Sequence, residues 1–314
     1  MALTFAATPK SAPTTGHRRP AQGRRALSRH LTGWAFAGPA TLIVVGLSLF
    51  PAVWAFFISR AKWNGIAPAT QVGWGNYERL AGDPDMAAAA QHTLLLTALF
   101  VPASIVVGIL VAVALNQKIR LIGFYRTCIF VPYVASAAAT GILASFVFNP
   151  QFGAANEALR AVGIPAQQFL ESPGQAMYII CVIALWGEIG FTAVIYLAAL
   201  QDIPKELVEA ARTDGASPWR IFWHVTLPEL RPVTVFTAIW QTITAMQLFD
   251  LIYTTTRGGP LNSTQTVVYY IYELAFQTQR LGYGAAAAYL LFAVTLLLSL
   301  LVIWYSRRRG SEAF

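Results

Sequence analysis

The chain has 314 residues, of which 56% are hydrophobic and only 11% are charged. An ordinary soluble domain carries about 25% charged residues, so this composition excludes a soluble globular protein and indicates a membrane protein. The formal net charge of +8 is compatible with binding to nucleic acid, with an anionic lipid surface, or with the topology bias of cytoplasmic loops.

The N-terminal residues 1–32 are rich in Pro, Ser, Thr, Gly and Arg, which predicts a disordered basic tail. The apolar run 34–59 is too long for the core of a signal peptide, so it predicts a first membrane span that is retained. Five further segments reach the length of about 20 apolar residues that a bilayer core requires. The six predicted spans are 34–59, 92–115, 125–148, 176–200, 233–253 and 284–305, within a membrane domain of residues 33–306.

Prolines lie inside several of these spans, at Pro39, Pro51, Pro102 and Pro132. Neighbouring helices in a membrane can satisfy the backbone groups that a proline frees, so these prolines predict kinks and not helix ends. The predicted fold is therefore all-α and polytopic, with six transmembrane helices.

The lysines and arginines distribute unequally between the two sets of loops. The tail, the connections 116–126 and 201–231, and the C-terminal residues 307–314 hold 16 of them, whereas the alternate loops hold six. The positive-inside rule therefore places both termini in the cytoplasm, as an N-in/C-in topology. Because topology explains the basic excess, nucleic acid is not expected as a partner.

The segment 201–232, between the fourth and fifth predicted spans, concentrates charges, prolines and a glycine in an otherwise apolar chain. Asp202 is predicted to cap a helix that has Pro204 in its first turn, where a missing amide donor has little effect. Asp214 and Gly215 are predicted to end this helix, because glycine adopts a positive φ at little steric cost.

A second helix is predicted to begin at Ser217, by the same capping logic, and to end at Pro228. Three aromatic residues at i, i+3 and i+4 share one face of it, namely Trp219, Phe222 and Trp223. Such a helix would either lie among the lipid headgroups, with its tryptophans as anchors, or dock into a groove on a soluble partner. The pattern alone leaves both interpretations open.

Eight residues of this segment resemble the cytoplasmic loop of ABC importer permeases, whose pattern is Glu-Ala-Ala, then Asp-Gly-Ala, then Leu-Pro. They are Glu209, Ala210, Ala211, Asp214, Gly215, Ala216, Leu227 and Pro228. The stretches GWGNYERL, FVPY, FNPQFGAAN, YLAALQDIPKEL and LFDLIYTTTRGGPLNSTQTVVYYIYELAF are similar to carbohydrate-uptake permeases, a group that includes maltose, disaccharide and glycerol-phosphate systems. The resemblance covers roughly residues 33–306.

The resemblance implies a permease subunit in a bacterial inner membrane. It implies three kinds of partner besides lipid: a second homologous permease, two ATP-binding subunits, and an extracytoplasmic solute-binding protein. ATP and Mg would be bound by the ATPase subunits, and this chain would be non-catalytic and hold no cofactor or metal. The sequence agrees, because it contains no Gly-x-x-x-x-Gly-Lys-Ser/Thr phosphate loop and no Gly-Lys pair.

In such permeases the cytoplasmic loop forms coupling helices that dock into a cleft on the ATPase. Besides the eight residues that match the pattern, the aromatic Trp219, Phe222 and Trp223 would serve as buried anchors of that interface. Ala210 and Ala211 would allow close approach, and Glu209 would offer a carboxylate to the partner.

Polar and aromatic residues inside the predicted spans mark a candidate solute pathway, because an acid at the bilayer centre costs about 2.5–3.5 kcal/mol on insertion scales. The candidates are Trp186, Glu188, Trp240, Gln241, Thr244, Gln247 and Asp250, and the third span adds Tyr133, Ser136 and Thr140. Ser, Thr and Gln also bridge helices in lipid, and Glu188 would alternatively pair with a neighbouring subunit, so both interpretations stand.

The turn Arg257, Gly258, Gly259 and Pro260 lies in an outer loop and is followed by a short amphipathic aromatic helix. It is either a plain surface loop or, by its position in the family, a contact for the binding protein. Cys128 and Cys181 lie in apolar runs without neighbours at metal-ligand spacing, which predicts packing roles.

Two other functions agree less well with the residues. An ion-coupled secondary transporter would favour an internal repeat and several embedded acids or histidines, whereas Glu188 and Asp250 stand almost alone here. A membrane-bound hydrolase would require histidines in one site, but the four histidines lie in the tail, at a span end and in the loop. Oligosaccharides, disaccharides and glycerol-phosphate-type solutes all remain open as substrates, although an anionic solute would call for Arg or Lys in the spans.

Overall fold

The computed structural model describes residues 34–117 and 119–308, and nearly all of its regular structure is helical. The helical segments are Trp34–Ser59, which includes η1 (Val45–Leu49) and α2 (Phe50–Ser59), then α3 (Gly75–Ala81), α4 (Pro84–Leu115), α5 (Ile122–Val134), α6 (Ala137–Val147), α7 (Ala154–Ala161), η2 (Phe169–Glu171), α8 (Ala176–Asp202), α9 (Lys205–Thr213), α10 (Pro218–Ile221), η3 (Phe222–Thr226), α11 (Leu227–Glu229), α12 (Arg231–Met246), α13 (Asp250–Thr254), α14 (Val267–Tyr272), η4 (Glu273–Gln277) and α15 (Leu281–Arg308). One antiparallel pair of two-residue strands, β1 (Ala61–Lys62) and β2 (Thr70–Gln71), joins Ala61 to Gln71. The all-α class is confirmed. The two predicted tails, residues 1–32 and 307–314, lie wholly or mostly outside the described residues.

The chain divides into two compact units, residues 1–54 and residues 55–314. In the first unit the described residues belong to one apolar helix, and its large side chains are exposed, as in Phe36 at 85% and Leu42 at 74%. Exposed apolar side chains of this kind suit contact with lipid hydrocarbon.

Five helical stretches of the described residues are long and apolar enough to cross a membrane, and a sixth candidate is the bent pair α5 and α6. Two details differ from the predicted spans. The second stretch begins at Pro84 and not at residue 92, because Asp83 caps it through the amides of Asp85 and Met86. The third is broken, since α5 and α6 meet at 99°.

The break in the third span follows Pro132, which lacks an amide hydrogen and cannot donate to the preceding turn. Ala135 and Ser136 then adopt extended backbone conformations, with ψ values of 145° and 131°, before α6 begins. The prediction that all four prolines would only kink their helices was therefore wrong for Pro132. Pro102 lies inside the continuous helix α4, as expected.

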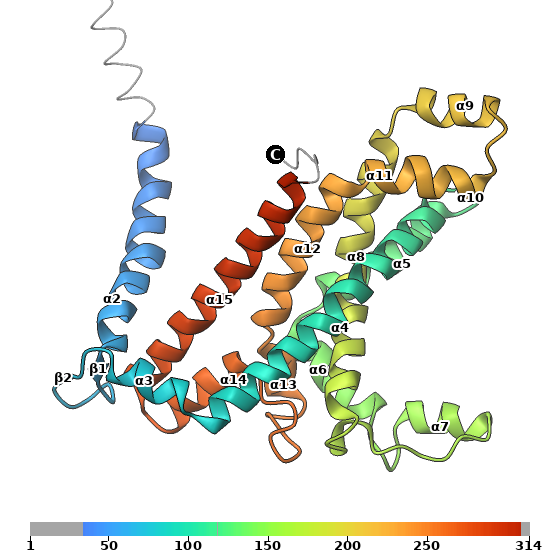
Figure 1. The fold of residues 1–314 in the computed structure, drawn as a ribbon. Coiled ribbons are helices and arrows are strands. Elements are labelled where there is room, and N and C mark those ends of the chain that lie inside the picture. The colour runs from blue at the N-terminus through green and yellow to red at the C-terminus, as the bar shows by residue number, and fades with distance from the viewer. Residues whose placement is uncertain (1–33, 118, 309–314) are drawn as a thin grey trace, which may run out of the picture. The chain divides into compact units, whose positions relative to one another are not determined.

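In the second unit, α4 packs along α8, α12 packs against both α4 and α15, and α5 lies against α8 (Figure 1). Gly190 permits the last contact, because a Cβ at this position would lie 2.5 Å from the carbonyl oxygen of Ile129 on α5. This close backbone approach is typical of helix interfaces within membranes.

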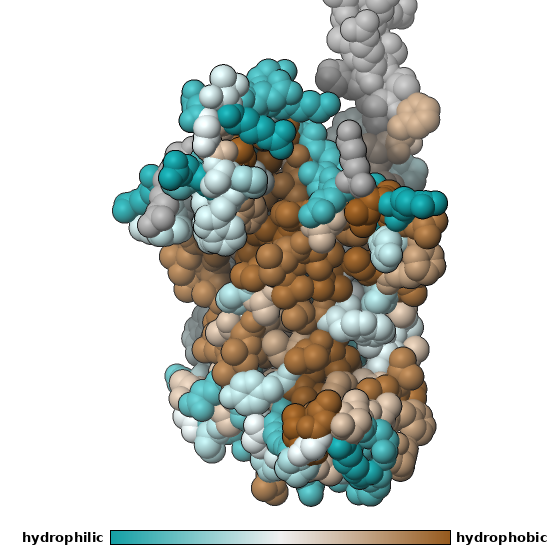
Figure 2. Space-filling view, turned by 90° about the vertical axis from the view of Figure 1, so that its right-hand side faces the viewer, coloured by the Kyte–Doolittle hydropathy of each residue, from teal (hydrophilic) through white to brown (hydrophobic). Residues whose placement is uncertain are grey.

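The polar residues of the second unit gather at its two ends. Figure 2 shows hydrophilic surface at the end that carries α9 and α10 and at the opposite end, with an apolar band between them. Such a band matches the hydrocarbon core of a bilayer. The loop with α9 and α10 therefore lies on one side of the membrane, and α3, α7 and the β1–β2 hairpin lie on the other.

Asp83 connects three helices at the end of the second unit that carries α3. Its Oδ2 accepts hydrogen bonds from the hydroxyls of Tyr270 at 2.7 Å and Tyr283 at 2.6 Å, while Oδ1 caps α4. Burial alone would raise the pKa of this carboxyl, but the hydrogen bonds from Tyr283, Tyr270 and the two amides outweigh burial and lower it. The ionised form therefore holds α4, α14 and α15 together.

We expect Asp83→Ala to lower the free energy of unfolding by about 1–3 kcal/mol, because two nearly buried tyrosine hydroxyls lose their acceptor. Since the pKa of Asp83 is lower in the folded state, its contribution is present above the unfolded pKa and is lost as pH falls through the folded value. Thermal unfolding of the purified complex as a function of pH measures both effects. Glu157→Ala, which removes an exposed ion pair with Arg160, is the control and should change little.

Candidate functional site

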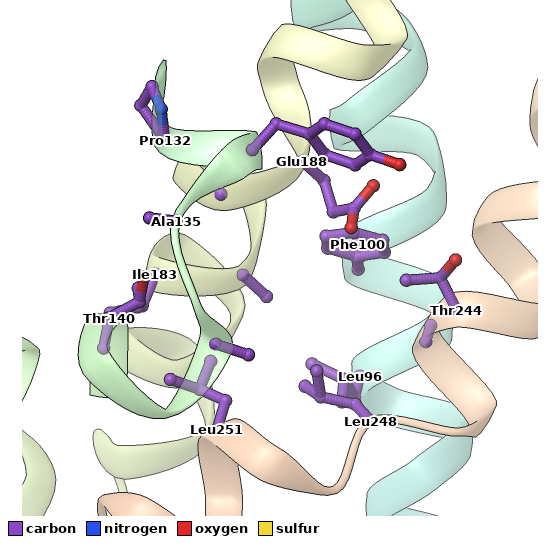
Figure 3. Close-up of a pocket in the computed structure, with 15 residues that line it drawn as sticks. Leu96, Phe100, Pro132, Ala135, Thr140, Ile183, Glu188, Thr244, Leu248 and Leu251 are labelled. Carbon is purple, nitrogen blue, oxygen red and sulfur yellow. The ribbon is translucent and has the colours of Figure 1, made fainter. Parts of the chain in front are cut away.

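A cavity of about 150 Å³ lies where the broken span meets α4, α8 and α12 (Figure 3). Fifteen residues line it: Leu96, Phe100, Pro132, Tyr133, Ala135, Ala137, Thr140, Ile183, Ala184, Gly187, Glu188, Thr244, Ala245, Leu248 and Leu251. Most are apolar, and the polar ones are two threonines, a tyrosine and one carboxylate. This is the composition of a small-molecule site, in which a few polar groups orient a ligand against apolar walls.

The broken helix supplies one wall of the cavity. Ala135 lines it at the point where the backbone leaves helical conformation, and Thr140 follows one turn into α6. At membrane depth, non-helical backbone is tolerated only where it is buried in protein or borders a water-filled space. The position of the helix break beside the cavity agrees with this rule.

Glu188 is the one carboxylate in the lining, and it lies near the middle of α8. Figure 3 shows its side chain pointing from α8 toward the space between the broken span and α4. Its Oε2 is buried and has no hydrogen-bond partner among the described residues. A buried acceptor without a donor is costly, so this oxygen is available to a ligand that brings a hydroxyl.

Aromatic rings continue from the cavity along the side of α8. Tyr133, which lines the cavity, stacks on Phe191 with ring centroids 5.1 Å apart, and Phe191 lies 5.4 Å from Trp240. Trp240 itself does not line the cavity and is 43% exposed. The aromatic candidate Trp240 is therefore outside the cavity, and the aromatic residues of the lining are Tyr133 and Phe100.

Gln241 bridges two helices and does not line the cavity. It is fully buried, and its Nε2 donates to Thr192 Oγ1 on α8 at 2.7 Å. Thr192 in turn donates to the carbonyl of Glu188 at 3.2 Å. This is the bridging role that was the alternative for polar residues in the spans, and it joins α12 to the turn of α8 that carries Glu188.

The remaining pathway candidates lie in different environments. Thr244 lines it, but Gln247 is exposed at the end of α12, and Asp250 is exposed at the start of α13. Trp186 lines a neighbouring apolar cavity of about 270 Å³ that shares Thr140. Gln247 follows the last residue of α12, Met246, and does not line the cavity with Thr244.

Several lining residues were not singled out from the sequence. Tyr133 and Thr140 were expected near one face of the third span, whereas Leu96, Phe100 and Leu248 carry no polar signal. Ser136, also expected there, precedes α6 and lies outside the lining. Apolar wall residues cannot be distinguished from core residues by composition, since both face inward.

The loop between α8 and α12 forms a helix, a tight turn and a second helix. Gly215 adopts φ of +77°, and the amide of Ala216 donates to the carbonyl of Ala211 at 3.0 Å, which closes a Schellman turn. Ser217 caps the second helix, since its Oγ accepts from the amide of Arg220 at 3.3 Å. Glu209 and Asp214 are exposed beside this turn.

Two helix boundaries in this loop were predicted wrongly. Asp202 is the last residue of α8 and caps nothing, while Pro204 precedes α9 as its N-cap residue. Pro228 does not end the second helix, because the π-helical η3 precedes it and the amide of Leu227 donates to the carbonyl of Phe222. This wider turn places Pro228, which has no amide hydrogen, where the helix can continue to Glu229.

The aromatic stripe of the loop is divided between two environments. Trp219 and Trp223 are 71% and 46% exposed, with ring centroids 5.5 Å apart. Phe222 instead packs on the cluster formed by α4, α8 and Leu230. Leu227 joins that cluster as well, and Ala210 is exposed while Ala211 and Ala216 are half-buried. The exposed part of the stripe is therefore a pair of tryptophans.

The turn at Arg257 to Pro260 is tightly folded. The hydroxyls of Thr256 and Thr264 lie 2.7 Å apart, and Thr264 also donates to the carbonyl of Gly259 at 2.7 Å. Gly258 is buried with φ of +81°, while Arg257 is exposed. The turn thus presents a single cation from a fixed backbone.

Comparison with known proteins places these features in a family. Residues 104–310 match the family described as binding-protein-dependent transport system inner membrane component. The chain is 35% identical over 294 residues to the lactose transport system permease protein of Rhizobium radiobacter, covering 91% of this chain and 98% of that protein. It is 31% identical over 268 residues to the sn-glycerol-3-phosphate transport system permease protein of Agrobacterium fabrum, covering 85% and 91%.

Solved structures share the fold. A crystal structure of a bacterial ABC transporter involved in the import of the acidic polysaccharide alginate aligns with a TM-score of 0.81 at 22% identity, covering 92% of this chain and 100% of that chain. The alginate transporter in complex with its alginate pentasaccharide-bound periplasmic protein aligns with a TM-score of 0.80 at 23% identity, covering 91% and 98%.

Proposed function

Because this chain belongs to the family of binding-protein-dependent transport system inner membrane components, we propose that it forms half of the pathway of an ABC importer for a neutral sugar. The chain is a multi-pass permease subunit of the bacterial plasma membrane and is not an enzyme, since ATP hydrolysis belongs to separate subunits. The cavity at the broken third span, with the unpartnered Glu188 oxygen, is the observation that carries the solute proposal.

A neutral sugar fits the chemistry of this cavity better than an anion does. Sugar hydroxyls would donate to Glu188 and exchange hydrogen bonds with Thr140 and Thr244, and the faces of Tyr133 and Phe100 would cover the sugar ring. No Lys or Arg of the described residues lines the cavity, so a phosphate would meet a carboxylate without a counter-charge. A glycerol-phosphate-type solute would require a cation from the partner permease.

The size of the cavity supports a shared pathway. Ligand pockets usually measure about 300–1,000 Å³, whereas this one measures about 150 Å³. A second homologous permease would supply the other half, and it would also cover the candidates that are exposed in this chain, namely Trp186, Trp240, Gln247 and Asp250. Two ATP-binding subunits, which hold ATP and Mg, and an extracytoplasmic solute-binding protein would complete the transporter.

The loop with α9 and α10 is proposed as the contact with the ATPase, in an N-in/C-in topology. The 16 to 6 division of Lys and Arg supports its cytoplasmic location. The exposed Trp219 and Trp223 suit anchors in a protein groove, and Glu209 and Asp214 suit donors from the partner. The turn at Arg257 to Pro260 lies at the opposite end of the helical bundle from this loop. It is proposed as a contact for the binding protein.

Purification of the tagged chain from its own bacterium, together with the subunits that co-purify, tests this function. In nanodiscs the complex should hydrolyse ATP faster when a solute-binding protein loaded with a neutral disaccharide is added. A thermal-shift screen of that binding protein, with lactose, maltose and sn-glycerol-3-phosphate as probes, identifies the solute. Uptake driven by an ion gradient without ATP, or binding of sn-glycerol-3-phosphate alone, would contradict the proposal.

A further inference from the structure

A polar cleft, separate from the pathway cavity, lies at the end of the helical bundle opposite α9 and α10. It measures about 530 Å³, and its walls are the β1–β2 hairpin, α3 and the turn before α15 (Figure 1). Eleven residues line it: Lys62, Trp63, Asn64, Ala67, Pro68, Thr70, Asn76, Arg79, Gln279, Arg280 and Tyr283. Of these, only Tyr283 belongs to a candidate membrane span, so the cleft opens beyond the hydrocarbon.

Three cations share this cleft, one from each wall: Lys62, Arg79 and Arg280. No carboxylate lines it, and none of the three forms an ion pair with any described residue. The guanidinium of Arg79 lies 5.7 Å from the centre of the Tyr283 ring. The three positive charges are not neutralised by a carboxylate in the lining. Their summed positive potential therefore attracts an anion to the cleft.

Hydrogen bonds fix the frame that carries these cations. The amide of Gly282 donates to the carbonyl of Trp63 at 3.1 Å, which joins the start of α15 to the hairpin. The buried Asn76 on α3 donates from Nδ2 to the carbonyls of Ser59 at 2.8 Å and Ala61 at 3.0 Å.

The floor of the cleft is fixed as well. Tyr283 is held by its hydrogen bond to Asp83, which lies outside the lining. Because the frame is rigid, an arriving anion does not have to order it, and binding loses less entropy.

We infer that this cleft binds acidic side chains on the surface of the solute-binding protein. The inference rests on the proposed function and adds a docking site distinct from the turn at Arg257. The polar neutral side chains Asn64 and Gln279 at the cleft suit hydrogen bonds to a protein carboxylate. Charges at the rim of an interface act mainly on the rate of encounter and on its salt dependence, so the cleft would steer the loaded binding protein onto the permease.

The test uses the complete transporter in nanodiscs and the solute-binding protein identified by the assay above. We expect Lys62→Gln combined with Arg280→Gln to raise the Kd for the loaded binding protein about tenfold at low salt, with most of the change in the association rate. The dependence of Kd on salt should become shallower, because fewer charges are screened. ATP hydrolysis without binding protein should stay at the wild-type rate.

Arg160→Gln is the matched control, since it removes a cation at the same end of the molecule that is already paired with Glu157. Unchanged affinity and salt dependence in the double variant, with wild-type stimulation intact, would overturn the docking site while leaving the importer function in place. No stimulation even with the wild-type permease would instead defeat the proposed function. A loss of affinity confined to nanodiscs with anionic lipid would assign the cleft to lipid phosphate and overturn the inference.

Discussion

Replacement of Glu188 by alanine is expected to lower solute uptake about tenfold or more, because the loss of a buried hydrogen-bond partner costs about 1–3 kcal/mol. Its Oε2 is buried without a donor among the described residues, so a solute hydroxyl can bond to this oxygen, and the variant also removes the contact of the carboxyl with Gln241. Complex assembly and the hydrolysis of ATP in the absence of solute should be retained. Uptake by vesicles that contain the whole transporter measures the effect.

Two variants separate a solute contact from a packing effect at Glu188. Glu188→Gln keeps the shape and one acceptor oxygen, so uptake should recover in part. Thr295→Val removes a buried polar group on α15 that donates within its own helix at 2.8 Å and lies away from the cavity, so uptake should stay close to wild type. If Glu188→Ala transported with unchanged kinetics, the residue would not belong to the pathway.

Replacement of Gly215 by valine is expected to abolish the coupling of ATP hydrolysis to uptake while the permease remains folded. The φ of +77° suits glycine, and a side chain there brings a strain of roughly 1–2 kcal/mol, more for a β-branched residue. A Cβ at this position meets no atom within 4 Å in this chain. The damage therefore falls on the turn and on whatever docks against it.

Gly163 offers a matched control for this change. It has φ of +79° and equally open surroundings, but it lies in the turn after α7, at the opposite end of the molecule from α9. Gly163→Val should reproduce the local strain and leave coupling intact. Gly215→Asn, which tolerates a positive φ, distinguishes turn shape from steric exclusion, since it keeps the turn but adds a side chain. If ATP hydrolysis stayed fully coupled to uptake in Gly215→Val, the loop would not take part in coupling.

Local signals in the sequence predicted much of the loop and less of the spans. Gly215 and Ser217 act as predicted, because a positive φ and a helix cap depend on neighbours within a few residues. The prediction of a kink at Pro132 was wrong because a proline allows either a kink or a break. The 99° angle between α5 and α6 depends on how these helices pack against α8 and α13.

The lining of the cavity could be predicted only in part. Glu188 stood out because an acid is rare within a span, and in the structure it lines the cavity. Gln241 carried a similar polar signal, yet Thr192 on α8 takes its amide. Hydrophobic periodicity gives the face of a helix but not the partner that a polar side chain meets across the interface.

The sequence by itself determined the membrane class, the approximate positions of the apolar spans, the charge division between loops and the motif from Glu209 to Pro228, because each depends on composition or on local spacing. Tertiary structure alone decided which residues converge. Glu188, Thr140 and Thr244 meet at one cavity, and Lys62, Arg79 and Arg280 meet at one cleft, although long stretches of chain separate them. Their meeting depends on the direction of the helix break and on helix packing, which no local pattern encodes.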